Sequence, residues 1–315
     1  MVLVGQSSQS TARAAQALQR GDLIGLPTET VYGLAADACN ANAVAKIFDI
    51  KGRPSDHPLI VHVTDIDSAK RFASDIPDFA KRLIDAFWPG PLTLILPRKA
   101  DVATAAAGGQ SSVGIRCPSH AVAREILQAA QALGVWGVAA PSANKFGRVS
   151  PTTAAHVQAE FGEALLIVDG GACDVGIESA IVDCTRGQPV LLRPGVLTLE
   201  QLSNACGEKV LMQGEQISIR TNAPKASGTL AAHYAPAAKL FLMDKQMIDQ
   251  KLLQHQGAFS LAIWSRAPLQ AESQALFDKN QSLHWQPMPS DPVQCAHALF
   301  AQLRVFDDLG VKQIW

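Results

Sequence analysis

Short apolar runs alternate with amphipathic segments along the first 205 residues. Each run is bounded by Gly, Pro or polar clusters and predicts a strand, whereas apolar residues at helical spacing between the runs predict helices. Several runs are apolar throughout, which is typical of a sheet covered by helices. The predicted strands are residues 23–26, 58–63, 92–96, 112–117, 136–140, 165–168, 180–183 and 190–193. The predicted helices are residues 11–20, 41–48, 79–87, 121–133 and 152–161.

The alternation stops beyond residue 205 and resumes near residue 239. Residues 206–236 are polar and turn-rich and predict a long connection without a helix. The C-terminal segment predicts a small α/β domain, with strands at 240–243 and 260–264 and helices at 247–255, 270–277 and 293–309. We therefore expect a first domain at 1–205, a linker at 206–236 and a second domain at 237–315.

Composition narrows the class of protein. The chain has 315 residues, 48% of them hydrophobic and 17% charged, so it has ample material for a core. A net charge of -1, from 27 basic and 28 acidic residues, argues against binding nucleic acid mainly through bulk electrostatics. The six cysteines form no C-x-x-C pair, so we expect reduced thiols in a cytoplasmic protein, without disulfides and without a protein-ligated metal site.

No apolar run in the sequence approaches the ~18–20 residues of a membrane span. The N-terminal segment also lacks the basic flank and longer apolar core of an export signal. The sequence therefore predicts a protein that is neither membrane-embedded nor exported.

Several common catalytic motifs are missing. The sequence contains neither the G-x-x-x-x-G-K-[ST] of a P-loop nor the G-x-G-x-x-G of a dinucleotide site. It also lacks the H-E-x-x-H of zincins and the G-x-S-x-G of α/β-hydrolases. If the protein binds a nucleotide, it does so without a P-loop or a dinucleotide-binding motif.

Polar clusters instead flank the apolar runs, where ligands of open α/β sheets tend to bind. Taken singly, some are explained without a ligand: Ser150 can cap a helix, and Lys51 can be a solvated loop charge. His62 is about as consistent with an ordinary histidine in a sheet as with a ligand-binding residue. Arg116 and Arg193 are different, because a cation within an apolar strand needs a partner or a ligand. Together the clusters favour one anion-binding site.

The same clusters carry a family resemblance. The segments PTETVYGL, KGRPSDHPLIVHV, SVGIRCP, APSANKFGRVSPTTAAHV, GIESAIVD and LLRPG resemble the YrdC-like domain, in order and spacing, over roughly the first 195 residues. With the linker and the small C-terminal domain, the chain resembles the two-domain threonylcarbamoyl-AMP synthases. The resemblance implies a YrdC-like twisted open mixed sheet with flanking helices, followed by a small Rossmann-like α/β domain.

The resemblance also implies an activity. Members of this family condense L-threonine, bicarbonate or carbon dioxide, and ATP to L-threonylcarbamoyladenylate and pyrophosphate, with Mg²⁺. Other proteins then transfer the threonylcarbamoyl group to tRNA, so we expect a functional link to that machinery and no need for stable tRNA binding by this chain. Catalysis would rest on positioning and electrostatics, with no covalent intermediate.

The resemblance assigns site residues motif by motif. Lys51, Arg53 and Arg116 are the expected catalytic residues. The residues expected around threonine are Thr30, His62, Arg116, Ala140 and Ser179. Those expected around ATP are Lys51, Arg53, His57, Ser112, Ser142, Asn144, Ser150, Arg193, His233 and Tyr234.

The linker departs from the family pattern S-P-G-M-x-x-x-H-Y-A-P. Here residues 226–236 read ASGTLAAHYAP, which keeps Gly228 and the HYAP segment but lacks the Pro and the Met. We still expect a lid over the nucleotide, contacting it through His233 and Tyr234.

Two other functions share this fold. A YrdC-like domain can be an RNA-binding module, which the neutral net charge disfavours here. It can also be the carbamoyl-handling domain of hydrogenase-maturation proteins, but this chain has nothing like their zinc-finger and acylphosphatase segments.

The C-terminal domain shows no nucleotide motif, and we expect it to be structural or to dock a partner.

Overall fold

The computed structural model describes residues 1–215, 224–226, 234–255, 259–269, 277 and 280–315. The chain divides into two compact units. The first comprises Met1–Phe146 and Ser150–His233, and the second comprises Gly147–Val149 and Tyr234–Trp315.

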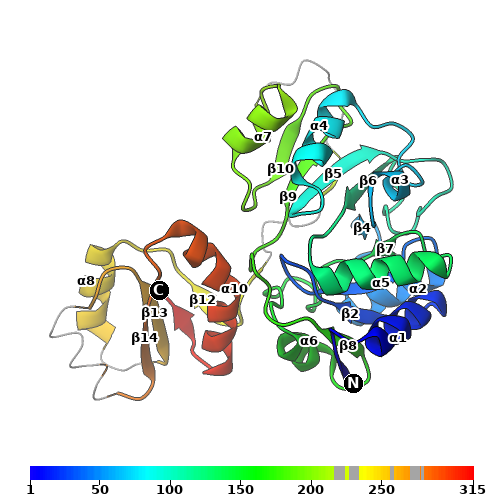
Figure 1. Cartoon of the computed structure of the whole chain (residues 1–315). Helices are drawn as coiled ribbons and strands as arrows, with labels where there is room; N and C mark the ends of the chain where they lie inside the picture. The colour runs from blue at the N-terminus through cyan, green and yellow to red at the C-terminus, as the bar shows by residue number, and fades with distance from the viewer. Residues whose placement is uncertain (216–223, 227–233, 256–258, 270–276, 278–279) are drawn as a thin grey trace. The chain divides into compact units, whose positions relative to one another are not determined.

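A mixed sheet forms the centre of the first unit, with the strand order β1-β8-β2-β3-β7-β4-β6-β5-β9-β10-β11 (Figure 1). The strands are β1 (Val2–Val4), β2 (Ile24–Leu26), β3 (Gly33–Asp37), β4 (Ile60–His62), β5 (Leu92–Pro97), β6 (Ser112–Arg116), β7 (Val138–Ala139), β8 (Leu166–Asp169), β9 (Ala180–Asp183), β10 (Val190–Arg193) and β11 (Leu211–Met212). Parallel and antiparallel pairs both occur, which confirms the predicted mixed sheet.

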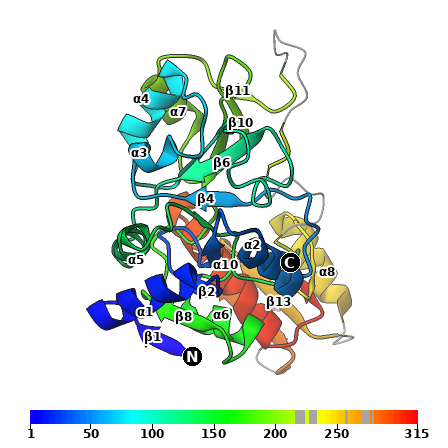
Figure 2. The same cartoon turned by 90° about the vertical axis from the view of Figure 1, so that its right-hand side faces the viewer.

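Helices cover this sheet. They are α1 (Ser8–Gln19), α2 (Ala41–Lys51), α3 (Ile66–Ala69), α4 (Asp78–Phe87), α5 (Ala121–Ala132), α6 (Ala154–Phe161) and α7 (Leu199–Cys206). Helices α1 and α5 lie side by side, and their apolar faces share a core with β2 that includes Leu18, Ile24 and Ile126 (Figures 1 and 2). Helices α4 and α7 pack together in the same way at the other end of the unit.

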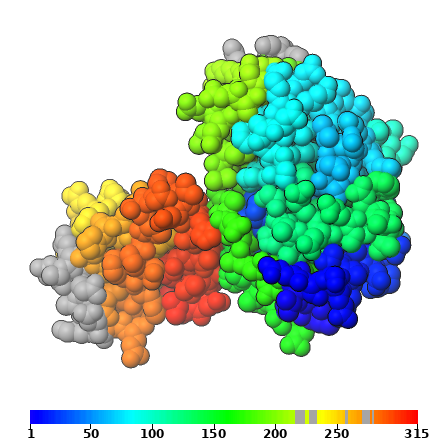
Figure 3. Space-filling view, viewed as in Figure 1, coloured from blue at the N-terminus to red at the C-terminus, as the bar shows by residue number. Residues whose placement is uncertain are grey.

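Segments distant in sequence thus share one surface, as the blue N-terminal residues and the green α5 and α6 regions do in Figure 3.

Both ends of helix α2 are capped. At the N-terminus the Asn40 side chain accepts a hydrogen bond from the Ala43 amide at 3.1 Å. At the C-terminus Gly52 adopts the left-handed conformation, with φ 64°, in which a side chain would be strained. This sharp stop fixes where the chain leaves the helix, and so the positions of Lys51 and Arg53 on either side of the glycine.

The second unit has a small parallel sheet in the order β12-β15-β13-β14, which includes β12 (Lys239–Leu240), β13 (Leu261–Ser265), β14 (Leu283–Pro287) and β15 (Gln313–Ile314). Its helices include α8 (Lys245–His255) and α10 (Pro292–Asp308). Asp291 caps α10 by accepting from the Gln294 amide at 2.8 Å, and Pro292 fills the first helical position. This unit is the predicted second α/β domain.

Several features differ from the sequence-based expectation. Strand β3 begins directly after the PTETVY segment and returns antiparallel to β2, so this segment closes a strand pair. Helices α3 and α7 and strands β1, β14 and β15 were not predicted. Strand β11 lies within the predicted linker but pairs with β10, so the first part of that segment belongs to the sheet. Most of the predicted helix 270–277 lies outside the described residues. Across the described chain, no helix has the length and apolar character that crossing a membrane requires.

Candidate active site

Strand pairing brings together His62 and Arg116, two of the residues that are predicted to bind the substrate threonine. His62 on β4 is the register partner of Arg116 on β6, and Arg116 is the partner of Thr93 on β5. Partners directly opposite each other in neighbouring strands project to the same face of a sheet. Three polar side chains from three different parts of the sequence therefore lie in one row across the sheet.

Arg116 is the centre of this row. Its Nη1 donates to Thr30 Oγ1 at 2.7 Å, and its Nε donates to the Gly90 carbonyl at 3.2 Å. Its Nη2 lies 2.6 Å from Glu29 Oε1, and both side chains of this ion pair are buried, with exposures of 4% and 5%. The strand arginine thus has the partner that burial demands, and the partner comes from the PTET segment.

The charges at this end of the site are set by the ion pair. Burial opposes ionisation of Glu29, but the Arg116 guanidinium, together with the backbone at Glu29 and Ser119, outweighs it and lowers the pKa of the carboxyl. Burial and the same guanidinium both lower the pKa of His62, to about 3, so its imidazole is neutral at physiological pH. The site therefore offers one anion, one cation and a neutral imidazole.

A chain of hydroxyls and a second arginine continue from this row. Ser179 Oγ lies 2.8 Å from Thr93 Oγ1, and Arg193 donates to both the carbonyl and the Oγ of Ser179, at 3.0 and 3.1 Å. Glu178, next to Ser179, accepts from Ser150 Oγ at 2.8 Å and lies 3.6 Å from Arg193 Nη2. Arg193 therefore links the residues predicted for threonine to those predicted for ATP.

Lys51 is not the solvated loop charge that the sequence allows. It is the last residue of α2, is 3% exposed, and its ammonium donates to the carbonyl oxygens of Ser142 and Asn144. Burial and the nearby Arg53 charge lower its pKa to about 7. The loop interpretation is wrong because the left-handed turn at Gly52 ends the helix one residue later, with Lys51 turned inward.

Arg53 and His57 surround an aromatic ring. The Arg53 guanidinium carbon lies 5.8 Å from the centroid of Phe146, and the His57 ring meets that ring edge-on at 5.6 Å. Arg53 Nη2 also donates to the Pro58 carbonyl at 3.0 Å. The Phe146 amide in turn donates to the Lys51 carbonyl at 2.9 Å, so the two cations and the ring form one cluster.

The remaining predicted residues lie on neighbouring segments. Ser112 opens β6 and is 8% exposed, and Ala140 follows β7 with its amide donating to the Ile60 carbonyl at 3.0 Å. Asn144 is 1% exposed, and its Nδ2 donates to the Lys145 carbonyl at 2.7 Å. His233 and Gly228 lie outside the described residues. Tyr234 belongs to the second unit, where its ring lies 5.4 Å from that of Phe300.

Four side chains of this arrangement are absent from the residues that the sequence predicted: Glu29, Thr93, Glu178 and Phe146. The signal for Glu29 and Glu178 was present in the sequence. Each is an acid beside a predicted site residue, in a chain whose buried arginines need anionic partners. Thr93 has no such signal, because only strand pairing places it beside Arg116.

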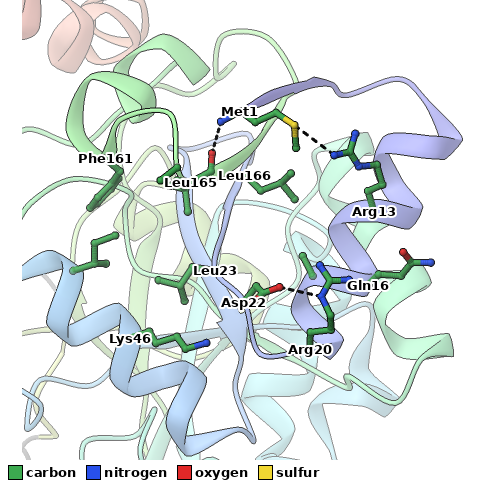
Figure 4. A pocket seen from close by; sticks show the side chains of 13 residues that line it. Met1, Arg13, Gln16, Arg20, Asp22, Leu23, Lys46, Phe161, Leu165 and Leu166 are labelled. Atoms are coloured by element: carbon green, nitrogen blue, oxygen red, sulfur yellow. Dashed lines mark hydrogen bonds and ion pairs between the residues drawn. The ribbon is translucent and has the colours of Figure 1, made fainter.

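A separate pocket of about 530 Å³ contains none of the predicted site residues. It lies against α1 and α2, and its lining includes the apolar side chains of Phe161 and Leu166 (Figure 4). Two of its cations are engaged, since Arg20 pairs with Asp22 at 3.1 Å and Lys46 donates to the Gly21 carbonyl at 2.7 Å. We therefore place the candidate site around Arg116, Arg193 and Lys51.

The structure matches known proteins over its whole length. Residues 16–195 match the family model described as "Telomere recombination" (Sua5/yciO/yrdC), and residues 197–315 match "Threonylcarbamoyl-AMP synthase, C-terminal domain". The chain belongs to the threonylcarbamoyl-AMP synthase family. The Sua5 of P. abyssi, whose crystal structure was solved in complex with L-threonine, superimposes with a TM-score of 0.87 at 32% identity, covering 100% of this chain and 91% of that one.

Two curated members of the family are similar in sequence. The chain is 41% identical over 232 residues to the threonylcarbamoyl-AMP synthase of Pyrococcus abyssi, and 43% identical over 235 residues to that of Bacillus subtilis. These alignments cover 73% and 74% of this chain and 67% and 66% of the two relatives, or about two thirds of each. The family resemblance read from the motifs is confirmed.

Proposed function

We propose that the protein is an L-threonylcarbamoyladenylate synthase, which makes threonylcarbamoyl-AMP and pyrophosphate from L-threonine, bicarbonate or CO2, and ATP. The observation that carries this proposal is the continuous polar row from Arg116 through Thr93 and Ser179 to Arg193. One end of the row suits an amino acid and the other suits phosphates. The relatives' common name and the threonine bound to P. abyssi Sua5 support the same activity.

The Arg116 end supports threonine binding. A guanidinium offers paired donors that match a carboxylate, and this one is held in place by Thr30, Gly90 and Glu29. His62 and Ser179 add neutral polar groups that can hydrogen-bond a substrate hydroxyl or a carbamate. Ala140, which follows strand β7, is the remaining residue that we propose for the threonine pocket.

The Lys51 and Arg193 end supports ATP binding. Lys51, Arg53 and Arg193 bring three cations to the segments that also carry Ser142 and Ser150. Such cations offset the charge that develops as the carbamate oxygen attacks the α-phosphate and pyrophosphate leaves. Their contribution is electrostatic and needs no covalent enzyme intermediate.

Magnesium would enter with ATP. In the described residues no group of three or more His, Cys, Asp or Glu side chains could hold a metal ion. Glu178, an acid beside Ser150 and Arg193, would face an ion carried by the phosphates. When bound, Mg²⁺ would neutralise phosphate charge.

Part of the linker lies against the site. The Lys225 amide donates to Gln110 Oε1 at 2.8 Å, Gln110 Nε2 donates back to the Lys225 carbonyl at 3.4 Å, and Lys225 Nζ lies 2.6 Å from Asp56. Lys225 also lines a small pocket together with Thr93 and Ser112. These contacts support the proposal that the linker is a lid that keeps water from the carbamate and the adenylate, both of which hydrolyse readily.

Incubation of the purified protein with ATP, L-threonine and bicarbonate tests the function. Threonine-dependent release of pyrophosphate, with threonylcarbamoyl-AMP detected by mass spectrometry, is the expected result. ATP consumption that does not depend on threonine would contradict it. We further propose that the product passes to the tRNA threonylcarbamoyl-transfer machinery in the cytoplasm, which the same assay tests when that machinery and tRNA are added.

A further inference from the structure

The guanidinium that suits a substrate carboxylate already faces a carboxylate of the protein. Glu29 Oε1 lies 2.6 Å from Arg116 Nη2, and both side chains are buried. A buried ion pair of this kind is neutral as a whole but has a strong local dipole. A lone carboxylic acid entering here would compete with Glu29 for the guanidinium and would meet its negative charge at close range.

A zwitterion does not meet this penalty. At neutral pH an α-amino acid carries a carboxylate and an ammonium group on neighbouring carbons, so its dipole can lie antiparallel to that of the Glu29–Arg116 pair. We infer that Glu29 binds the α-ammonium group of the amino-acid substrate while Arg116 binds its carboxylate. This inference rests on the proposed function and assigns a binding role to a residue that the sequence motifs left without one.

The unused hydrogen-bonding capacity of Glu29 supports this role. A carboxylate can accept about four hydrogen bonds. The backbone at Glu29 and Ser119 helps to lower the pKa of this carboxyl, yet apart from the ion pair neither oxygen has a partner with good hydrogen-bond geometry among the described residues. A carboxylate on a side chain that is 5% exposed and so poorly satisfied is costly to bury. The three N–H groups of an ammonium would supply the donors that it lacks.

The backbone around Glu29 is held firmly, so its carboxylate is in place before substrate arrives. On one side Thr28 Oγ1 donates to the Val31 carbonyl at 2.6 Å and accepts from the Thr30 amide at 3.3 Å. On the other side the Glu29 carbonyl accepts from the Val175 amide at 2.7 Å. Such preorganisation is what a recognition residue needs.

His62 does not take over this role. Its imidazole is neutral, as its pKa of about 3 requires, so it adds no charge to the pair. Within the ion pair, Glu29 is therefore the group that tells an amino acid from the corresponding acid without nitrogen. The proposed selectivity is for the ammonium group itself.

Two ligands that differ only in that group test the inference. Calorimetry compares L-threonine with (R)-3-hydroxybutanoate, which is threonine without its amino group, on wild type and on Glu29→Gln. In the variant we expect threonine affinity to fall on the order of 10- to 100-fold, the range for loss of a charge-assisted hydrogen bond. The affinity for (R)-3-hydroxybutanoate should stay the same or rise, because nothing now competes for Arg116. A merely structural role would weaken both ligands together.

Asp183→Asn is the matched control. Asp183 is also a buried carboxylate paired with an arginine, Arg186 at 2.5 Å, but it stands at the far end of β9 from Ser179. This variant should keep the wild-type preference for threonine in its folded fraction. If Glu29→Gln does not fold, the same ligand comparison is made on Glu29→Asp, whose side chain keeps the negative charge but is shorter by one methylene. Loss of preference supports the inference.

Unchanged preference for threonine in a folded Glu29 variant would overturn the inference and leave the synthase activity standing. Equal weakening of the two ligands would also overturn it. If wild type itself shows no threonine-dependent adenylate synthesis, the proposed function fails as well. The activity assay on wild type and the ligand comparison on the variants therefore separate the two failures.

Discussion

Replacing Lys51 by methionine should change how the stability of the first unit depends on pH. Folding lowers the pKa of this lysine from 10.5 to about 7 because its ammonium is buried and lies near Arg53. Between these two values the unfolded chain keeps the proton that the folded chain has released. Because the unfolded state then binds more protons, wild-type stability rises with pH through this window. Lys51→Met has no proton to release and lacks this contribution.

The size of the effect comes from the same two values. Each unit of pKa difference corresponds to about 1.36 kcal/mol, so wild type should gain about 2 kcal/mol over Lys51→Met between about pH 7 and about pH 9. Urea unfolding of both proteins at the two pH values, read on the transition of the first unit, measures this difference. The comparison cancels the other titrating groups, which the two proteins share.

Lys46→Met is the matched control, because Lys46 is an exposed lysine on the same helix. Its stability should follow the wild-type pH dependence. If the difference between wild type and Lys51→Met stays constant from about pH 7 to about pH 9, Lys51 titrates as an ordinary lysine and the reasoning from its burial is refuted.

Four further predictions concern substrate binding, activity and the linker. Arg116→Ala should raise the threonine KM on the order of 100-fold, through loss of charged hydrogen bonds worth ~1.5–3 kcal/mol each, and an unchanged KM in a folded variant would contradict this. ATP binding should take up a proton above about pH 7, because the ATP phosphates favour the charged form of Lys51. Calorimetry in buffers of different ionisation enthalpy measures this proton uptake, and Lys51→Arg should abolish the uptake because arginine stays protonated. Gln110→Ala should release the linker at Lys225, so that protease cuts within 206–236 faster and more of the adenylate is hydrolysed, whereas unchanged cutting would show that this contact does not hold the linker. A fragment of residues 1–215, which keeps β11 on the sheet, should stay folded by circular dichroism but lose most coupled activity, and full activity would reduce the linker to a tether.

The sequence predicted the fold class and most elements because the information for them is local. Strands β9 and β10 have the predicted bounds, and the helix predicted at 121–133 is α5. Strand β3 was missed because its short GLAAD segment lacks the β-branched and aromatic residues that mark strands. Strand pairing with β2 and β7 stabilises it regardless of propensity.

The site was predicted in part for the same reason. An arginine within an apolar strand identifies itself from sequence, since burial obliges it to find a partner, and this argument selected Arg116 and Arg193. The identity of the partner is not local. In the sheet order β3, β7 and β4 lie between β2 and β6, so the contact between Glu29, which follows β2, and Arg116, which ends β6, depends on how the loop after β2 folds in three dimensions.

By itself, then, the sequence determined the alternation of helices and strands, the motifs of the family and the residues that could not be buried without partners. Only the tertiary structure decided which charges meet and how far water is excluded from them. Lys51 shows the difference. The sequence around it is consistent with an exposed lysine, yet its ammonium is buried against the carbonyls of Ser142 and Asn144, and this burial lowers its pKa. Propensity depends on neighbours along the chain, whereas pairing and desolvation depend on neighbours in space, and those are fixed only when the sheet assembles.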